Sequence, residues 1–256
     1  MAVTLGRHAE RLSGVRALRT PKGRREQRRF AFEGAVLLEE ARRSAYPVEE
    51  IYATGIAYEG TPLVRELEGE GVPVFVVDDR AAAKISDLES PPGIVAVAPA
   101  RLTPAEAVFG EAGCVLVLAD LNDPGNAGTL LRSADAFGCR GVVFGATGVD
   151  PYHPKVVRSA MGAIFRLQLA VLAPAEAARA GNYTFLGLAA HGAALEGSDW
   201  PERAGIVVGN ERHGLGEWAA ICSRLLSIPM PGGAESLNAA VAGSIALYAR
   251  SLRVSG

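Results

Sequence analysis

The sequence predicts an α/β protein that is built from two successive units. Strand-like and helix-like segments alternate along the 256 residues, and this length fits one or two domains. The run Val115–Ala119 is continuously apolar, as a parallel strand covered on both faces would be. Pro99, Pro104 and Gly110 precede this run and mark a connection. We therefore expect a first α/β unit over residues 1–100, a linker over 101–111 and a second α/β unit over 112–256.

The first unit is expected to contain three helices and three strands. Pro62 takes the first position of one helix, where its missing N–H does no harm, and Thr61 is a plausible cap. Another helix is amphipathic, with apolar residues at 36–38 and charged residues at 39, 40, 42 and 43. The helices are predicted at Phe32–Ala45, Thr61–Glu70 and Asp79–Leu88, and the strands at Val48–Ala53, Val72–Val77 and Ile94–Ala98.

In the second unit, strands are predicted at Val115–Ala119, Gly141–Phe144, Leu167–Leu172, Thr184–Ala189, Ile206–Val208 and Leu225–Ile228. A helix begins after Gly125 and ends at Gly138, and two shorter ones cover Lys155–Met161 and Leu215–Cys222. The last helix begins at Ser236 as N-cap and runs to about Arg253. It carries few charges before Arg250, so we expect it to be buried on most sides, in part against a second subunit.

Basic residues concentrate at the amino-terminal end. The formal net charge of the chain is −2, but residues 1–29 hold nine Lys or Arg and only two acids. Such a basic arm ahead of an acidic segment indicates a polyanionic partner. The alternative is a solvated, partly disordered tail.

Several classes of protein are disfavoured. The sequence has no GxGxxG, GxxxxGK[ST], HExxH or GxSxG motif, which disfavours dinucleotide, P-loop, zinc-protease and esterase chemistry. The three cysteines, Cys114, Cys139 and Cys222, form no ligand cluster, and their sparse number suits a reducing cytoplasmic location. Cys114 and Cys139 are expected in the core. There is neither a transmembrane run nor a secretory leader, so no membrane partner is expected.

Polar residues stand where three of the predicted strands end. After the first strand of the second unit, Asp123-Pro124-Gly125 forms a turn and Asn126 begins a helix, with Arg132 seven residues after Gly125 on the same face. The plainer interpretation is that Asn126 is only a helix cap and that Arg132 pairs with Asp135.

The second and third polar segments follow later strands. Ile206–Val208 leads into Gly209-Asn210-Glu211, where glycine would let a ligand approach the backbone and Glu211 would stand at a ligand-binding sheet edge. Residues 228–238 run through a Gly-rich loop to a capped helix, whose free N–H groups favour a polar ligand group. Ordinary polar turns would explain both segments as well.

Together, the three segments resemble the motifs of the SpoU (TrmH-like) branch of the SPOUT methyltransferases. The matching stretches are DPGNAGTLLRSADAFG, GIVVGNERHGL and IPMPGGAESLNAAVA, with HPKVVRSAMGAIFRL between them, so the likeness covers residues 115–248. The first unit resembles the RNA-binding domain of the ribosomal-protein-L30 type through RRFAFEGAVLLEEA and PPGIVAVA.

The resemblance implies an α/β-knot: a mainly parallel α/β domain with a deep carboxy-terminal trefoil knot, preceded by the small L30-like α/β domain. It implies S-adenosylmethionine (AdoMet) as cofactor, RNA as substrate and a homodimer formed through the knotted domain. By motif position, the AdoMet pocket involves Gly209, Ile228 and Leu237, with Met230 lining it. The catalytic cluster is Asn126, Arg132, Glu211, Ser236 and Asn238, and no metal is expected.

The expected reaction is methylation of a ribose 2′-hydroxyl. The L30-like domain favours 23S rRNA; the alternatives are tRNA, a non-catalytic RNA-binding protein of the same fold, and a base methylase. Arg132 is sometimes assigned as general base in this family, but a guanidinium is always protonated. We therefore expect Arg132 to clamp a phosphate and to stabilise the developing alkoxide, with Glu211 or the RNA phosphate taking part in proton removal. Arg212 stands where the family commonly has glycine, and it either contacts RNA or narrows the cofactor site.

Overall fold

The computed structural model describes residues 3–4, 10–232 and 235–254, and it divides the chain into two compact units. The first comprises residues 1–101 and 152–165, and the second comprises residues 102–151 and 166–256. The alternation of helices and strands confirms the predicted α/β class. The domain boundaries drawn from the sequence remain a prediction, but they would assign the segment 152–165 to the second unit.

Aromatic packing explains why this segment belongs with the first unit. The ring of Tyr152 lies 4.5 Å from that of Phe30, and Phe165 lies 5.1 Å from Phe32 and 5.2 Å from Tyr46, measured between centroids. Tyr46 is half-buried and the other four rings are buried. Aromatic pairs at such distances attract each other in addition to the area they bury. The helix α9 (Pro154–Ser159) follows Tyr152.

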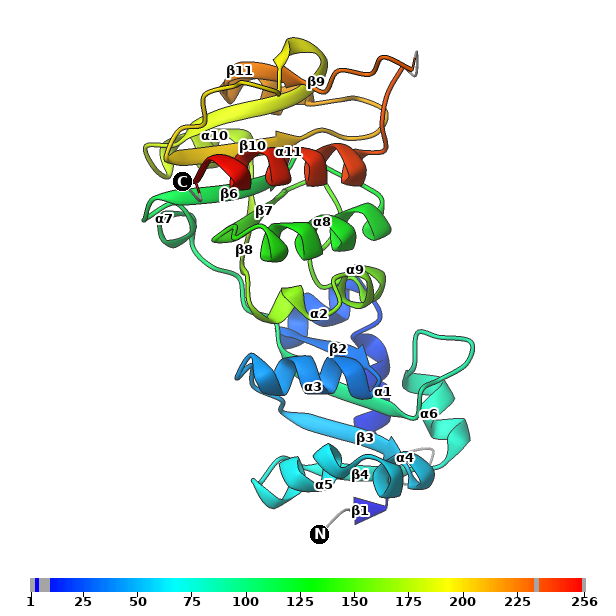
Figure 1. The fold of residues 1–256 in the computed structure, drawn as a ribbon. Helices are drawn as coiled ribbons and strands as arrows, with labels where there is room; N and C mark the ends of the chain where they lie inside the picture. The colour runs from blue at the N-terminus through cyan, green and yellow to red at the C-terminus, as the bar shows by residue number, and fades with distance from the viewer. Residues whose placement is uncertain (1–2, 5–9, 233–234, 255–256) are drawn as a thin grey trace. The chain divides into compact units, whose positions relative to one another are not determined.

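The first unit contains a five-stranded mixed sheet (Figure 1). Strand β4 (Val74–Val77) is parallel to β1 (Val3–Thr4) and to β3 (Glu50–Thr54), whereas β5 (Ile94–Pro99) is antiparallel to β3 and to β2 (Arg29–Glu33). The three predicted strands are present as β3, β4 and β5. Strand β2 was missed, because it overlaps the start of the helix predicted at Phe32–Ala45.

The end of β2 shows why that helix begins later. Phe30 and Phe32 are buried while their neighbours are half-buried, the alternation of a strand with one covered face. Gly34 then adopts a φ of 92°, which side chains other than glycine rarely tolerate, so helix α3 (Ala35–Arg43) begins only after it. The other predicted helices of this unit are α5 (Pro62–Gly69) and α6 (Asp79–Ile85), and the short α4 (Gly55–Gly60) was not predicted.

Residues 10–27 of the basic segment form two helices, α1 (Glu10–Ala17) and α2 (Pro21–Gln27). Leu12 and Val15 of α1 are buried in one core with residues of α6. The alternative of a disordered tail is therefore wrong for this part, because an apolar face anchors it. Several cations already pair with acids of the same unit, among them Arg11 with Glu50 at 3.2 Å. Arg7 lies outside the described residues.

The second unit contains a six-stranded sheet in which every pairing is parallel. The predicted strands are all present, and the spatial order is β11 (Cys222–Ser227), β9 (Thr184–Ala194), β10 (Arg203–Val208), β6 (Gly113–Leu118), β7 (Gly141–Gly145) and β8 (Gln168–Leu172). Because the strands are parallel, the segments that follow β6, β10 and β11 emerge at one edge of the sheet.

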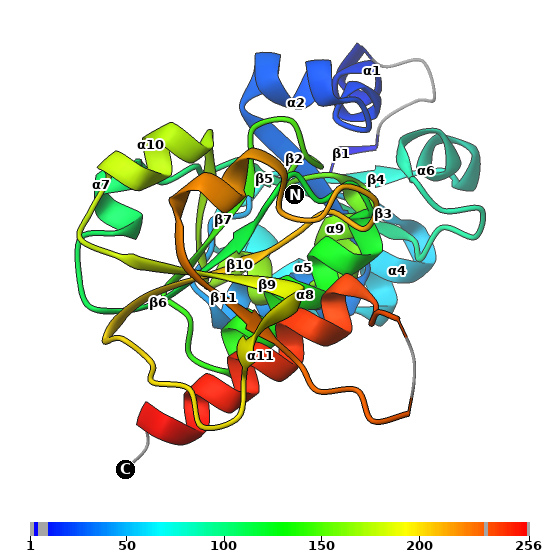
Figure 2. The same ribbon diagram turned by 90° about the horizontal axis from the view of Figure 1, so that it is seen from above.

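Helices cover both faces of this sheet. Helices α8 (Pro124–Ala136) and α11 (Ala239–Val254) lie side by side on one face (Figures 1 and 2). Their contact is close, since a Cβ at Gly243 would lie 2.4 Å from Leu130 Cδ2. On the other face, α7 (Ala105–Val108), α10 (Pro174–Arg179) and the 3₁₀ helix η2 (Gly216–Ile221) contribute Val108, Ala177 and Trp218 to a core with Val115 and Val117. Cys114 and Cys139 are buried, as predicted.

Two helical predictions for this unit need correction, and two short helices were not predicted. Asn238, and not Ser236, accepts the first N–H groups of the last helix, which therefore begins at Ala239. The helix predicted at Leu215–Cys222 is the 3₁₀ helix η2. Helix α7 lies within the predicted linker, and α10 was missed because six residues are too few to show a helical period.

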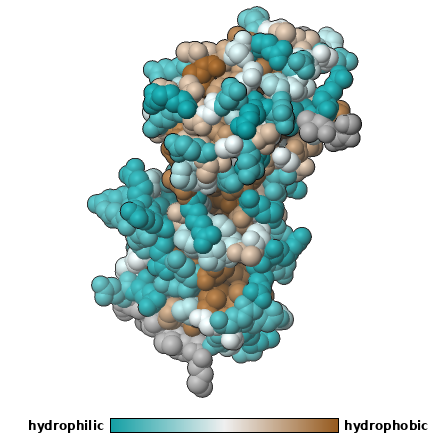
Figure 3. All heavy atoms as spheres, turned by 90° about the vertical axis from the view of Figure 1, so that its left-hand side faces the viewer, coloured by the Kyte–Doolittle hydropathy of each residue, from teal (hydrophilic) through white to brown (hydrophobic). Residues whose placement is uncertain are grey.

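Within the described ranges, no helix has the length and apolar character needed to cross a membrane. The side of the molecule seen in Figure 3 is mostly hydrophilic, with smaller hydrophobic areas.

Candidate active site

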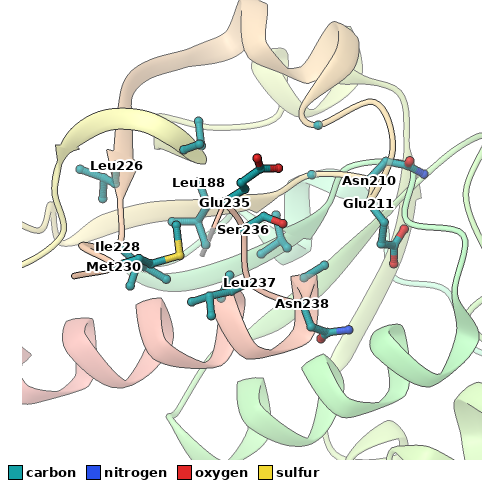
Figure 4. Close-up of a pocket in the computed structure, with 17 residues that line it drawn as sticks. Leu188, Asn210, Glu211, Leu226, Ile228, Met230, Glu235, Ser236, Leu237 and Asn238 are labelled. Carbon is teal, nitrogen blue, oxygen red and sulfur yellow. The ribbon is translucent and has the colours of Figure 1, made fainter. Parts of the chain in front are cut away.

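A cavity of about 430 Å³ opens at the carboxyl edge of the parallel sheet (Figure 4). Its walls come from the middle of β9, from the end of β10 and the loop after it, from β11 and the segment that follows it, and from the start of α11. Most of the residues predicted for the site from the sequence line it, namely Gly209, Glu211, Ile228, Met230, Ser236, Leu237 and Asn238. Asn126 and Arg132 are not among the lining residues.

A chain of side-chain hydrogen bonds joins the three sequence segments at the mouth of this cavity. Asn126 Nδ2 donates to Glu211 Oε1 at 2.7 Å, and Asn238 Nδ2 donates to Asn126 Oδ1 at 3.0 Å. Asn238 is itself oriented, because its Oδ1 caps α11 by accepting the N–H groups of Ala240 and Val241. Residues 126, 211 and 238 therefore form one polar cluster, with the Glu211 carboxylate at its end.

The structure decides against the plainer interpretation of Asn126. Asp123 is the N-cap of α8, since its Oδ1 accepts the N–H of Asn126 at 2.7 Å. The Asn126 side chain is thus left for Glu211 and Asn238, and it is not a cap.

Arg132 does not pair with Asp135 either. The Asp135 carboxylate accepts two hydrogen bonds from Arg166, at 2.8 and 2.9 Å. Arg132 is exposed on α8, and within the described part of the chain it has no hydrogen bond or ion pair. Its guanidinium is available for a ligand outside the chain.

The loop that carries Glu211 is closed at both ends. Asn210 and Gly214 exchange two backbone hydrogen bonds, at 2.7 and 2.9 Å. Asn210 Oδ1 also accepts the N–H groups of Arg212 and His213 at 2.9 and 3.3 Å. This turn leaves Glu211 little freedom, so the carboxylate is held in place before any substrate arrives.

Gly209 is needed for this loop as much as for the cavity. A Cβ at Gly209 would lie 2.5 Å from the carbonyl carbon of Gly214 and 2.8 Å from the nitrogen of Leu215. The backbone of residues 214 and 215 therefore occupies the space that a side chain at position 209 would need. The sequence suggested that a ligand approaches the backbone of Gly209 closely, but in the structure it is this loop backbone that does so. Gly209 still lines the cavity.

Asp120 and Trp218 stabilise the loop that carries Glu211, but they were not identified from the sequence. Asp120 follows β6 with a φ of 51°, a left-handed conformation that is uncommon outside glycine. Its carbonyl accepts Asn210 Nδ2 at 2.9 Å, and its carboxylate accepts Thr147 N–H and the indole N–H of Trp218, each at 3.1 Å. Asp120 was detectable as the first polar residue after an apolar strand, whereas no local signal distinguished the buried Trp218.

The cavity has an apolar end and an acidic end. Leu188, Leu226, Ile228 and Met230 gather on one side, and Glu211 lies on the other (Figure 4). Glu235 is a second carboxylate in the wall, and the lining includes no Lys or Arg among the described residues. This lining suits a ligand that combines an apolar ring system with positive charge.

Comparison with known proteins identifies the family. The sequence profile described as "SpoU rRNA Methylase family" matches residues 113–248, and that of an "MRM3-like substrate binding domain" matches residues 10–96. This chain belongs to the SpoU rRNA methylase family. The prediction made from the three motifs is confirmed.

Relatives resemble this SpoU methylase over almost its full length. A 23S rRNA (guanosine(2553)-2′-O)-methyltransferase of Bacillus subtilis is 31% identical over 246 residues, 93% of this chain and 95% of the relative. The AdoMet-bound rRNA methyltransferase of Sinorhizobium meliloti has 26% identity and a TM-score of 0.85, with 99% and 98% of the two chains covered. The SpoU methyltransferase AviRb of Streptomyces viridochromogenes, in complex with AdoMet, has 28% identity and a TM-score of 0.85, with 97% and 100% covered.

Proposed function

We propose that this SpoU methylase transfers a methyl group from AdoMet to a ribose 2′-hydroxyl of 23S rRNA. The observation that carries the proposal is the hydrogen-bonded chain Asn238–Asn126–Glu211 at the mouth of the cavity. It places a held carboxylate beside a cavity of suitable size and lining. The Bacillus relative is named for 2′-O-methylation of 23S rRNA, the family is named for rRNA methylation, and the two similar solved structures are methyltransferases with AdoMet bound.

The residues of the cavity fit AdoMet. Its volume of about 430 Å³ falls in the range of small-molecule sites, roughly 300–1,000 Å³. Ile228, Met230 and Leu237 would contact the adenine and ribose, with Gly209 at the back of the loop. The carboxylates of Glu211 and Glu235 would favour the positive charges of the sulfonium and the amino group. When bound, AdoMet supplies an electrophilic methyl group.

The polar cluster would act on the nucleophile. A ribose hydroxyl must lie in line with the methyl group and lose its proton as the new bond forms. Glu211 is the carboxylate at hand, and the bond from Asn126 leaves its other oxygen to accept that proton. Ser236 and Asn238 would hold the ribose at the same mouth of the cavity.

Arg132 would hold the RNA. A guanidinium group is a poor base, but its planar set of N–H donors suits a phosphate next to the target ribose. The same positive charge would stabilise the developing alkoxide. Its exposure and its freedom from ion pairs within the described structure agree with this role.

A methylation assay tests the function. Purified protein, protein-free 23S rRNA and labelled AdoMet should yield a 2′-O-methylated nucleoside, and Arg132→Ala should abolish it. Arg132→Lys keeps the positive charge but lacks the planar guanidinium that can bind two phosphate oxygens at once. Turnover near that of the wild type would therefore disprove bidentate binding of the phosphate by Arg132. Label on total RNA that migrates with tRNA would favour the tRNA alternative, and label on a base would favour a base methylase. AdoMet binding without transfer to any RNA would mean that the substrate or its assembly state is wrong. If AdoMet did not bind either, a non-catalytic RNA-binding protein would be favoured.

We further propose that the chain works as a homodimer and that the second unit contains the trefoil knot of the SPOUT fold. Val241, Tyr248 and Leu252 of α11 are 48%, 51% and 60% exposed, and their spacing of seven and four residues places them on one face. Such an exposed apolar face on a helix next to the site is suited to a second copy of the chain. Light scattering should give the mass of two chains, and a monomer at assay concentrations would contradict the dimer.

The first unit would select the RNA. Its resemblance to a substrate-binding domain over residues 10–96 supports this role. The exposed cations Arg16, Arg25 and Arg28, which have no acidic partner among the described residues, are its candidate phosphate contacts.

A further inference from the structure

Arg212 stands at the tip of the loop that holds Glu211. Its N–H is bound to Asn210 Oδ1 at 2.9 Å, so the backbone at this position is fixed by the same turn that fixes the carboxylate. Consecutive Cα atoms are about 3.8 Å apart. A long cationic side chain therefore starts from a fixed point directly beside the reacting group.

The side chain of Arg212 does not belong to the cofactor cavity. Its neighbours Glu211 and Gly214 line that cavity, whereas Arg212 is absent from the lining and is exposed. Within the described part of the chain it forms no side-chain hydrogen bond and no ion pair. Glu211, the nearest acid in sequence, is bonded to Asn126 instead.

Most arginines of the second unit are used within the fold. Arg140 and Arg166 pair with Glu111 and Asp135, and Arg203, Arg224 and Arg250 donate to backbone carbonyl groups. The exposed arginines without a described partner are Arg132, Arg179, Arg212 and Arg253. Arg132 and Arg212 belong to the two elements that are joined by the bond between Asn126 and Glu211.

We infer that Arg212 binds a phosphate of the RNA backbone beside the target nucleotide, as a second cation in addition to Arg132. This inference rests on the proposed function, because it assigns a residue to the RNA substrate of the same site. A fixed backbone lowers the entropy lost when the guanidinium engages a phosphate, and the planar fork matches two phosphate oxygens. The contact positions RNA, and Arg212 itself moves no proton.

The test compares Arg212→Gln and Arg212→Lys with the wild type, and Arg179→Gln is the matched control. Arg179 is an exposed arginine at the end of α10, which leads to the amino end of β9 and thus to the opposite edge of the sheet. Binding of protein-free 23S rRNA is measured between 50 and 200 mM salt, together with the KM for that RNA, kcat, and the AdoMet affinity. RNA binding can be measured without methyl transfer, so it tests Arg212 even if the protein methylates no RNA.

Arg212→Gln should raise the Kd and KM for RNA about tenfold at low salt, and it should lower the slope of log K against log salt by about 1. Its kcat at saturating RNA and its AdoMet affinity should stay within twofold. Arg212→Lys should keep the salt slope and recover part of the affinity. Arg179→Gln should match the wild type.

Unchanged RNA affinity and salt slope in Arg212→Gln, with an active wild type, would overturn the inference alone. A changed AdoMet affinity with unchanged RNA binding would show that Arg212 acts on the cofactor cavity, and would overturn it as well. If the wild type bound 23S rRNA but methylated no RNA, the proposed function would fail, and the comparison of binding would still test Arg212.

Discussion

Asn126→Asp is a nearly isosteric change that tests the polar cluster. It replaces the amide that donates to Glu211 Oε1 at 2.7 Å with a carboxylate. The donor is lost, and two negative charges face each other across the site. The helix cap of α8 depends on Asp123 and is left in place.

The size of the effect follows from two contributions. A hydrogen bond to a charged group is worth about 1.5–3 kcal/mol. Two unit charges about 4 Å apart repel by about 1 kcal/mol in water and by about 4 kcal/mol near a protein surface. Glu211 is exposed, so the lower values apply. A total of about 2–3 kcal/mol corresponds to a loss of about 30- to 160-fold in the methyl-transfer rate.

The assay is single-turnover transfer of labelled methyl to 23S rRNA at about pH 7.5, with Asn182→Asp as control. Asn182 is exposed and precedes β9 at the opposite edge of the sheet, so its change should leave the rate unaltered. The same bond and repulsion act in the folded protein without substrate, so the free energy of unfolding of Asn126→Asp should fall by no more than about 2–3 kcal/mol.

The pH dependence sharpens the test. Two facing carboxylates repel each other, so in this variant one of the two should gain a proton more readily as the pH falls. The protonated carboxyl can again donate to its neighbour. Asn126→Asp should therefore recover activity relative to the wild type at lower pH. Transfer within twofold of the wild type at neutral pH would refute the role given to this cluster.

Two further predictions concern stability. Trp218→Phe removes the indole N–H that donates to Asp120 from a fully buried position. It should lower the free energy of unfolding by about 1–3 kcal/mol and slow methyl transfer. Equal midpoints of urea denaturation for the variant and the wild type would contradict this prediction. Burial raises the pKa of Glu50, but the bonds from Tyr52 and Arg29 outweigh it and hold the pKa below the ordinary glutamate value. This stabilisation is present at neutral pH and is lost as the pH falls from the ordinary value through the lower folded one. Glu50→Gln should flatten that acid dependence in denaturation curves of the whole chain, and an unchanged dependence would exclude Glu50 as its source.

The sequence predicted the second unit better than the first. Buried parallel strands such as β6 and β7 are continuous apolar runs, and such runs stand out in a sequence. Strand β2 in the first unit was overlooked, because the apolar residues that follow it suggested one longer helix. Gly34, with its positive φ, is the single residue between β2 and α3, and the residue types around it do not predict this backbone conformation.

The candidate site was likewise predicted only in part from the sequence. The residue types at the strand ends, together with the family resemblance, were enough to name Asn126, Glu211 and Asn238. They did not show that Asn126 joins the other two, since residues 85 and 112 positions away reach it only through the strand order of the sheet.

The sequence by itself determined the α/β class, the family, the cofactor expected for it and most of the cavity wall, because these depend on residue types in local patterns. The tertiary structure alone decided which donors meet which acceptors. It assigned the Asp135 carboxylate to Arg166, which leaves Arg132 without a partner among the described residues, and it kept Arg212 out of the lining of the cavity. Such pairings depend on distances between segments far apart in the chain, and no local pattern encodes them.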